Sequence, residues 1–94
     1  MNELQKMLRK ARFEADLTIK EAAIGLGISA SHLHGIERGN IPRPKMATLT
    51  KLSQFYNLNH DDLCIAATRI PSDAFYKVVR KPELLRVIRE YPDA

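Results

Sequence analysis

The apolar positions of this chain recur at intervals of three and four residues, which is the spacing of an amphipathic α-helix. The spacing predicts five helices in succession and then two short ones, separated by a break at Ile70-Pro71-Ser72. The expected helices span residues 2–15, 19–25, 30–38, 45–56, a fifth beginning after Asn59, then 73–79 and 82–91. The pattern therefore predicts an all-α protein.

The inner faces of the first five expected helices supply the candidate core. These faces carry small and branched apolar residues, with two aromatic rings near the end of the fourth helix. The candidate core residues are Leu4, Met7, Leu8, Ala11, Ala15, Ala22, Ala23, Leu26, Leu33, Ile36, Met46, Leu49, Leu52, Phe55, Tyr56, Leu63, Ile65 and Ala66. The last two helices add a large apolar set of their own, which also needs burial: Phe75, Val78, Leu84, Leu85, Ile88 and Tyr91.

Polar capping residues and glycines indicate where the helices begin and end. Thr18 followed by Glu21 is a capping-box pattern at the start of the second helix, and Ser29 precedes the third. Gly27 lies at the turn between these two helices, and Gly39 follows the third helix as a terminating glycine. The later helices have their own expected starting residues: Asn59, Ser72 and Pro82.

Length and charge narrow the class of protein. The 94 residues suit one domain with a short appended element, and the expected boundary gives residues 1–69 and residues 70–94. Fifteen Lys and Arg residues against eleven Asp and Glu give a net charge of +4, with a pI near 9.5. A basic excess of this kind favours a polyanionic partner, because neutralised phosphates release their counterions.

The chain carries the marks of a cytoplasmic protein. Cys64 is the only cysteine, so an intrachain disulfide is impossible and a reducing compartment fits. The N-terminal residues are polar and do not resemble a signal peptide. No stretch approaches the roughly 20 apolar residues that span a bilayer, so no membrane association is expected.

The most informative segment is TIKEAAIGLGISASHLHGIERG, residues 18–39. It predicts two short helices joined by a tight glycine turn, with the small residues Ala22 and Ala23 where the helices cross. This spacing lets one helix brace the other while the second projects its outer face, as a helix-turn-helix requires.

The segment resembles the phage-repressor (Cro/cI, Xre-type) helix-turn-helix family. The positions that match the family pattern are Ala23, Gly27, Ser29, Leu33, Ile36, Glu37 and Gly39. The following residues, NIPRPKMATLTKLSQFYNLNHDDL, resemble the family's fourth and fifth helices, so the resemblance covers about residues 3–67. It implies a five-helix lambda-repressor-like DNA-binding domain with a short C-terminal helical extension.

The resemblance also implies which residues contact DNA. The helix over 30–38 would enter the major groove with an outward face that includes Gly35, and Arg43 and Lys45 would grip the backbone of the DNA. The expected DNA-binding residues are Ser29, Ala30, Ser31, His32, His34, Gly35, Arg38, Arg43 and Lys45. Ala30, Ser31 and Gly35 hold the usual base-reading positions but discriminate little between bases. Readout of DNA shape is therefore expected to contribute to specificity.

Two further residues align with a buried ion pair of the family. Arg12 and Glu37 are expected to join the first helix to the third as a structural pair. Loss of one partner would leave a buried charge and cost about 3–5 kcal/mol.

Other kinds of site are not indicated. His60 and Cys64 share a helix face at the spacing of metal ligands, but no second pair lies at ligand spacing, so no metal is expected and Cys64 is assigned to the core. No G-x-S-x-G, H-E-x-x-H or P-loop pattern occurs. We therefore expect no catalytic residue, no enzymatic activity and no cofactor.

The leading functional hypothesis is a sequence-specific transcriptional regulator, expected to be a repressor, that binds double-stranded DNA as a homodimer. The alternative is a protein-interaction module, such as an antitoxin or anti-regulator, built on a helix-turn-helix scaffold. The apolar residues after residue 70 could dimerise, bind a protein partner, or pack back on the first and fifth helices. The sequence leaves these three outcomes open.

Overall fold

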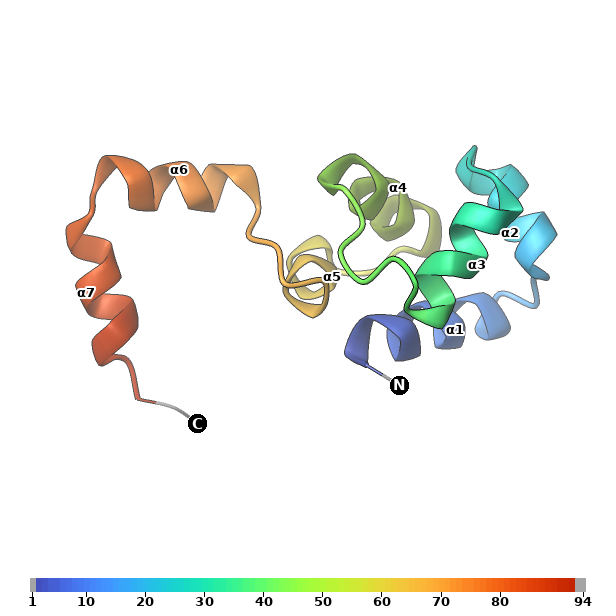
Figure 1. The fold of residues 1–94 in the computed structure, drawn as a ribbon, viewed down its shortest axis with the longest axis horizontal. Helices are drawn as coiled ribbons and strands as arrows, with labels where there is room; N and C mark the ends of the chain where they lie inside the picture. Colours follow the sequence, from blue (N-terminus) through green and yellow to red (C-terminus); the bar gives the residue numbers. More distant parts are fainter. Residues whose placement is uncertain (1, 93–94) are drawn as a thin grey trace.

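Helices make up all the regular structure in residues 2–92, the part of the chain that the computed structural model describes. Their bounds are α1 Glu3–Glu14, α2 Ile19–Leu26, α3 Ala30–Arg38, α4 Met46–Tyr56, α5 His60–Ala66, α6 Ser72–Arg80 and α7 Glu83–Glu90. The first five pack together, and the last two reach away from them as an arm (Figure 1). The predicted all-α fold is confirmed.

Local capping explains why most helices begin where they do. At α2, the hydroxyl of Thr18 accepts from the Glu21 backbone N–H at 3.1 Å, and the Glu21 carboxylate accepts from the Thr18 N–H at 3.0 Å. The N-terminus of α1 has the same reciprocal arrangement between Asn2 and Gln5, which the sequence analysis missed. Since each box satisfies two free backbone donors, both starts are firmly defined.

The core lies where α1, α3, α4 and α5 meet. Leucines dominate it, and α2 closes one side with the fully buried Ala22 and Ala23, which let it approach α3 closely. The buried apolar residues are Leu4, Leu8, Ala22, Ala23, Leu26, Leu33, Ile36, Leu49, Leu52, Leu63, Cys64 and Ala67. Three core predictions are wrong. Ala15, which follows the last residue of α1, is exposed. Phe55 is 38 % exposed and Ile65 is 64 % exposed, because each lies one position beyond the buried face of its helix.

The turn between α2 and α3 depends on a glycine. Gly27 ends α2 with φ of 72°, in the left-handed region that residues with a Cβ adopt only at a cost. Its N–H donates to the carbonyls of Ala23 and Ile24, and α3 then begins with Ser29 as its cap. This left-handed residue fixes the angle at which α3 leaves α2.

The arm formed by α6 and α7 buries none of its residues. The two helices meet at an elbow around Lys81, and Figure 1 shows α6 leading away from the five-helix part and α7 at the far end of the arm, running across the direction of α6. Of the three outcomes left open above, packing on α1 does not occur. Ser72 is the first residue of α6 rather than its cap, because Pro71 takes the cap position and leaves the Ser72 side chain without a capping bond.

Candidate nucleic-acid interface

The outer face of α3 is polar and accessible. Ala30, Ser31, His34 and Arg38 are exposed on this helix, and His32 is partly buried. At its N-terminus, Ser29 accepts a hydrogen bond from the His32 backbone N–H at 3.0 Å. The Ser29 hydroxyl proton remains able to donate to an external acceptor, so the cap and a contact with phosphate are compatible.

Gly35 does not face outward, and that expectation is wrong. The residue is buried, and a Cβ built there would lie 3.1 Å from Cδ1 of Ile41. The Ile41 N–H also donates to the Gly35 carbonyl at 3.1 Å. The loop after α3 therefore folds back over this position, and glycine allows its close approach.

The loop between α3 and α4 carries two exposed cations, and the guanidinium of the first, Arg43, donates from Nη2 to the Thr68 carbonyl beyond α5 at 3.4 Å. Arg43 and Lys45 are both exposed, while Pro44 between them is fully buried. Arg69, just beyond α5, donates from Nε to the Pro44 carbonyl at 2.6 Å and from Nη2 to the Arg43 carbonyl at 3.2 Å. One guanidinium thus holds the backbone between the two exposed cations.

The orientation of α3 relative to α1 is set by a buried ion pair. Arg12 Nε lies 3.1 and 2.9 Å from the two Glu37 carboxylate oxygens, and Arg12 Nη2 donates to the first of these at 3.0 Å. The remaining Arg12 nitrogen donates to the Leu17 carbonyl at 3.0 Å. The side chains are only 11 % and 3 % exposed, so the pair is held in a low-dielectric setting. It fixes α3 against α1 and the start of the next loop.

Tyr56 lies near this pair and is affected by it. Burial raises the pKa of the Tyr56 hydroxyl, the negative charge of Glu37 adds to the rise, and Arg12 opposes it. The hydroxyl is buried and has no hydrogen-bond partner within the described part of the chain. It is neutral at physiological pH and serves as part of the packing.

Residues 5–63 match the family model of a helix-turn-helix domain, and this match covers more than half of the chain. The chain belongs to the helix-turn-helix domain family. A relative in Bacillus subtilis (strain 168), an uncharacterized HTH-type transcriptional regulator named RghRB, is 32 % identical over 81 residues. The alignment covers 86 % of this chain but 57 % of the relative, so the chain spans little more than half of that protein's length. No solved structure gives a significant match.

Two basic residues of the helix-turn-helix domain, Arg9 and Arg69, were not singled out from the sequence. Arg9, on α1, lines an open hollow of about 650 Å³ together with His34, Glu37 and Arg38. The sequence pattern around Arg9 does not indicate that this residue of α1 lies near α3. Arg69 is 25 residues from the Pro44 carbonyl it binds, so only the fold brings them together.

Within residues 2–92, no helix is long and apolar enough to cross a membrane. Among the same residues, no three His, Cys, Asp or Glu side chains are grouped so as to hold a metal ion.

Proposed function

We propose that this chain is a DNA-binding transcriptional regulator of the phage-repressor (Cro/cI, Xre) type that inserts α3 into the major groove. The observation behind the proposal is the α2–turn–α3 unit with its accessible outer face, followed directly by the loop that carries the exposed cations Arg43 and Lys45 and that Arg69 braces. The family match supports it, as does the printed name of the Bacillus subtilis relative, an HTH-type transcriptional regulator.

The exposed residues of α3 predict modest direct readout of bases. Ala30 offers a methyl group and Ser31 a single hydroxyl, so both discriminate weakly between base pairs. His34 and Arg38 are the exposed donors on the same helix. Because Gly35 is covered by Ile41, it brings the loop close to the helix but offers no contact to DNA. Specificity then rests on His34, Arg38 and DNA shape, with His32 at the edge of the face.

We further propose that the protein acts as a homodimeric repressor assembled through the arm, residues 70–94. The support is the exposure of large apolar side chains on the arm, which a monomer rarely leaves in contiguous patches. These residues are Ile70, Phe75, Tyr76, Val79, Leu85, Val87, Ile88 and Tyr91, each at least 39 % exposed. Two copies of a helix-turn-helix are expected on half-sites about 34 Å apart, or a multiple of that spacing.

The same apolar arm supports a second candidate function, a protein-interaction module that recruits a different protein. Removal of the arm is expected to have different effects on DNA binding and on partner binding under the two functions. A chain ending at Ile70 remains able to bind DNA half-sites under the first function but loses the two-fold symmetric preference. Under the second function, the truncated chain loses its protein partner, and full-length protein shows no salt-sensitive affinity for DNA.

The test of DNA binding is selection of duplexes from a random pool at two salt concentrations. The expected result is enrichment of a two-fold symmetric site with an affinity that falls steeply as salt rises. An Arg43→Ala/Lys45→Ala variant should bind all duplexes more weakly and reduce the logarithmic salt slope by about 2. A Lys10→Ala/Lys51→Ala variant removes the same charge from other exposed positions and is the matched control. Equal loss in both variants would show that net charge, and not the braced loop, causes the effect.

A further inference from the structure

The hollow between α1 and α3 carries positive charge that its own lining does not neutralise. Arg9 from α1 and Arg38 from α3 both line this hollow of about 650 Å³. The carboxylate of Glu37 is the only acidic group in the lining, and it is already paired with Arg12 at 2.9 Å. Within residues 2–92, neither Arg9 nor Arg38 forms an ion pair. The hollow therefore has a surplus of two positive charges, and an anion is its complementary ligand.

The side chain of Arg9 is oriented by its own helix and keeps its hydrogen-bond donors available. Arg9 is partly buried, and its Cζ lies 5.8 Å from the centre of the Phe13 ring, one turn further along α1. This separation is within the range of a cation–π contact, which holds the cation against the ring. In the described part of the chain, the arginines whose side chains donate hydrogen bonds are Arg12, Arg43 and Arg69. The N–H groups of Arg9 can therefore all donate to a ligand in the hollow.

The hollow lies along one edge of the outer face of α3. At 3.6 residues per turn, Glu37 and Gly35 lie on opposite sides of the exposed His34. Glu37 faces α1, where it binds Arg12, and Gly35 is covered by Ile41 of the loop that follows α3. The outer face of α3 is therefore bounded by α1 along one edge and by this loop along the other. His34 also lines the hollow, so the hollow is continuous with the outer face.

We propose that Arg9 binds a backbone phosphate of DNA at the edge of the major groove that faces α1. The inference rests on the proposed insertion of α3 into that groove. The major groove is about 12 Å wide and an α-helix with its side chains about 10–12 Å across, so both phosphate backbones pass close to the flanks of α3. The backbone on the side of α1 then meets the hollow. The planar guanidinium of Arg9 suits this anion, because it can donate two parallel hydrogen bonds to phosphate oxygens.

The buried ion pair gives Arg9 a fixed position relative to α3. Arg12 follows Arg9 by three residues on α1, and its Nε lies 3.1 and 2.9 Å from the two carboxylate oxygens of Glu37. Because this pair joins α1 to α3, Arg9 and the outer face of α3 move as one rigid unit. A phosphate held by Arg9 therefore fixes how α3 lies in the groove, but it carries no information about the base sequence.

The test is titration of selected and random duplexes with the full-length protein at several salt concentrations. Arg9→Ala should weaken binding to all duplexes by about 10-fold. It should also reduce the logarithmic salt slope by about 0.9 for each Arg9 that contacts a phosphate. Arg9→Lys keeps the charge but loses the paired donors, so it should retain the salt slope and lose part of the affinity. Lys10→Ala is the matched control, because Lys10 is the next residue of α1, lies outside the hollow and is paired with Glu14 at 3.9 Å.

Ethylation of single phosphates on the duplex that binds best locates the contact. Ethylation of the phosphate held by Arg9 should weaken binding of the wild type but have no further effect on Arg9→Ala, whose folding is checked by circular dichroism. The proposal is overturned if Arg9→Ala binds DNA as Lys10→Ala does, or if the same phosphates matter for wild type and Arg9→Ala. It is also overturned if inorganic phosphate binds the wild type but not Arg9→Ala while both bind DNA equally, because the hollow is then a site for a free anion. Wild-type protein that binds no duplex at low salt would refute the proposed DNA-binding function itself, and this contact with it.

Discussion

The buried pair of Arg12 and Glu37 predicts a large and non-additive effect on stability. Glu37→Gln leaves the Arg12 cation inside the protein without its counter-ion, and Arg12→Met does the same to the Glu37 carboxylate. Removing one partner of a buried pair costs about 3–5 kcal/mol. A chain of this length has a free energy of unfolding of about 5–14 kcal/mol, so each single variant loses at least about a fifth of it.

The double variant distinguishes an unpaired charge from lost packing. Arg12→Met with Glu37→Leu fills much of the same volume with apolar groups, and such replacements are often neutral or stabilising. Its free energy of unfolding is expected within about 1–2 kcal/mol of wild type. The exposed pair of Lys10 and Glu14, 3.9 Å apart, is the matched control, because Lys10→Met should change stability by less than about 1 kcal/mol.

Urea unfolding followed by circular dichroism measures these differences. The transition midpoints should shift while the dependence on urea stays constant, because the surface exposed on unfolding barely changes. Two results would refute the reasoning. One is a loss below about 1 kcal/mol in both single variants, which is the range of solvent-exposed pairs. The other is a double variant whose loss equals the sum of the two single losses.

Four smaller effects follow from other contacts. Arg69→Gln removes a brace from the Pro44 carbonyl, so affinity for all duplexes should fall in DNA titrations; unchanged affinity would exclude a positioning role. Gly39→Ala adds a Cβ to a residue with φ of 84°, and this Cβ would clash with the Gln5 side chain. The substitution should destabilise the fold by more than about 1 kcal/mol and so lower the midpoint of thermal unfolding. Tyr56→Phe removes a buried hydroxyl that lacks a partner in the described residues and should stabilise by about 1 kcal/mol in urea unfolding, where a loss would reveal a hidden partner. Hydrogen bonds from the backbone and hydroxyl of Thr18 lower the pKa of Glu21, so the destabilisation by Glu21→Ala should be full above pH 4.5 and fade as pH falls through the lowered value; a pH-independent difference would contradict this.

The sequence predicts the helices well because their boundaries are set by neighbours in the chain. Ser29 and Gly39 bracket α3 at its observed bounds, and the expected second helix is one residue short of the observed α2. These features depend on capping and on backbone conformation, which a window of a few residues contains. The boundaries of the helices in this chain can therefore be predicted before the fold is known.

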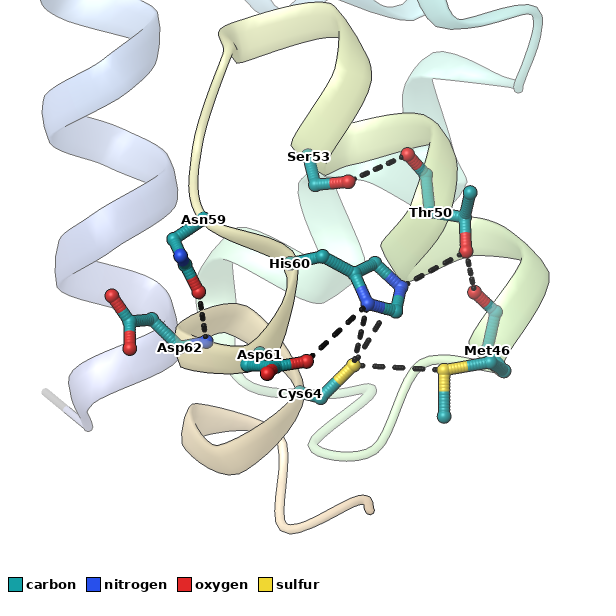
Figure 2. A network of polar contacts seen from close by, with 8 residues as sticks. All are labelled: Met46, Thr50, Ser53, Asn59, His60, Asp61, Asp62 and Cys64. Carbon is teal, nitrogen blue, oxygen red and sulfur yellow. Dashed lines mark hydrogen bonds and ion pairs between the residues drawn. The ribbon is translucent and has the colours of Figure 1, made fainter. Parts of the chain in front are cut away.

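Contacts between distant segments were not predictable in the same way. Gly35 was expected to face outward from its place on the helix alone, but the loop that carries Ile41 returns over it. Met46 and Cys64 are 18 residues apart and meet only because α4 and α5 pack together (Figure 2). Periodicity indicates which side of a helix is buried, and it does not identify the residue that covers that side.

The position of Arg69 gives the proposed dimer a physical link to the proposed DNA contacts. This residue binds the Pro44 carbonyl, and the next residue along the chain, Ile70, begins the apolar arm. Ile70 and Phe75 also line a hollow of about 340 Å³ with Arg43 and Met46, so the root of the arm lies close to the loop. Arg69 therefore connects the apolar arm directly to the loop between α3 and α4. If two arms pair, the loops of both protomers would be oriented by the same pairing. In a repressor of this design, the way in which the two arms pair would determine the distance between the two DNA half-sites that the dimer binds.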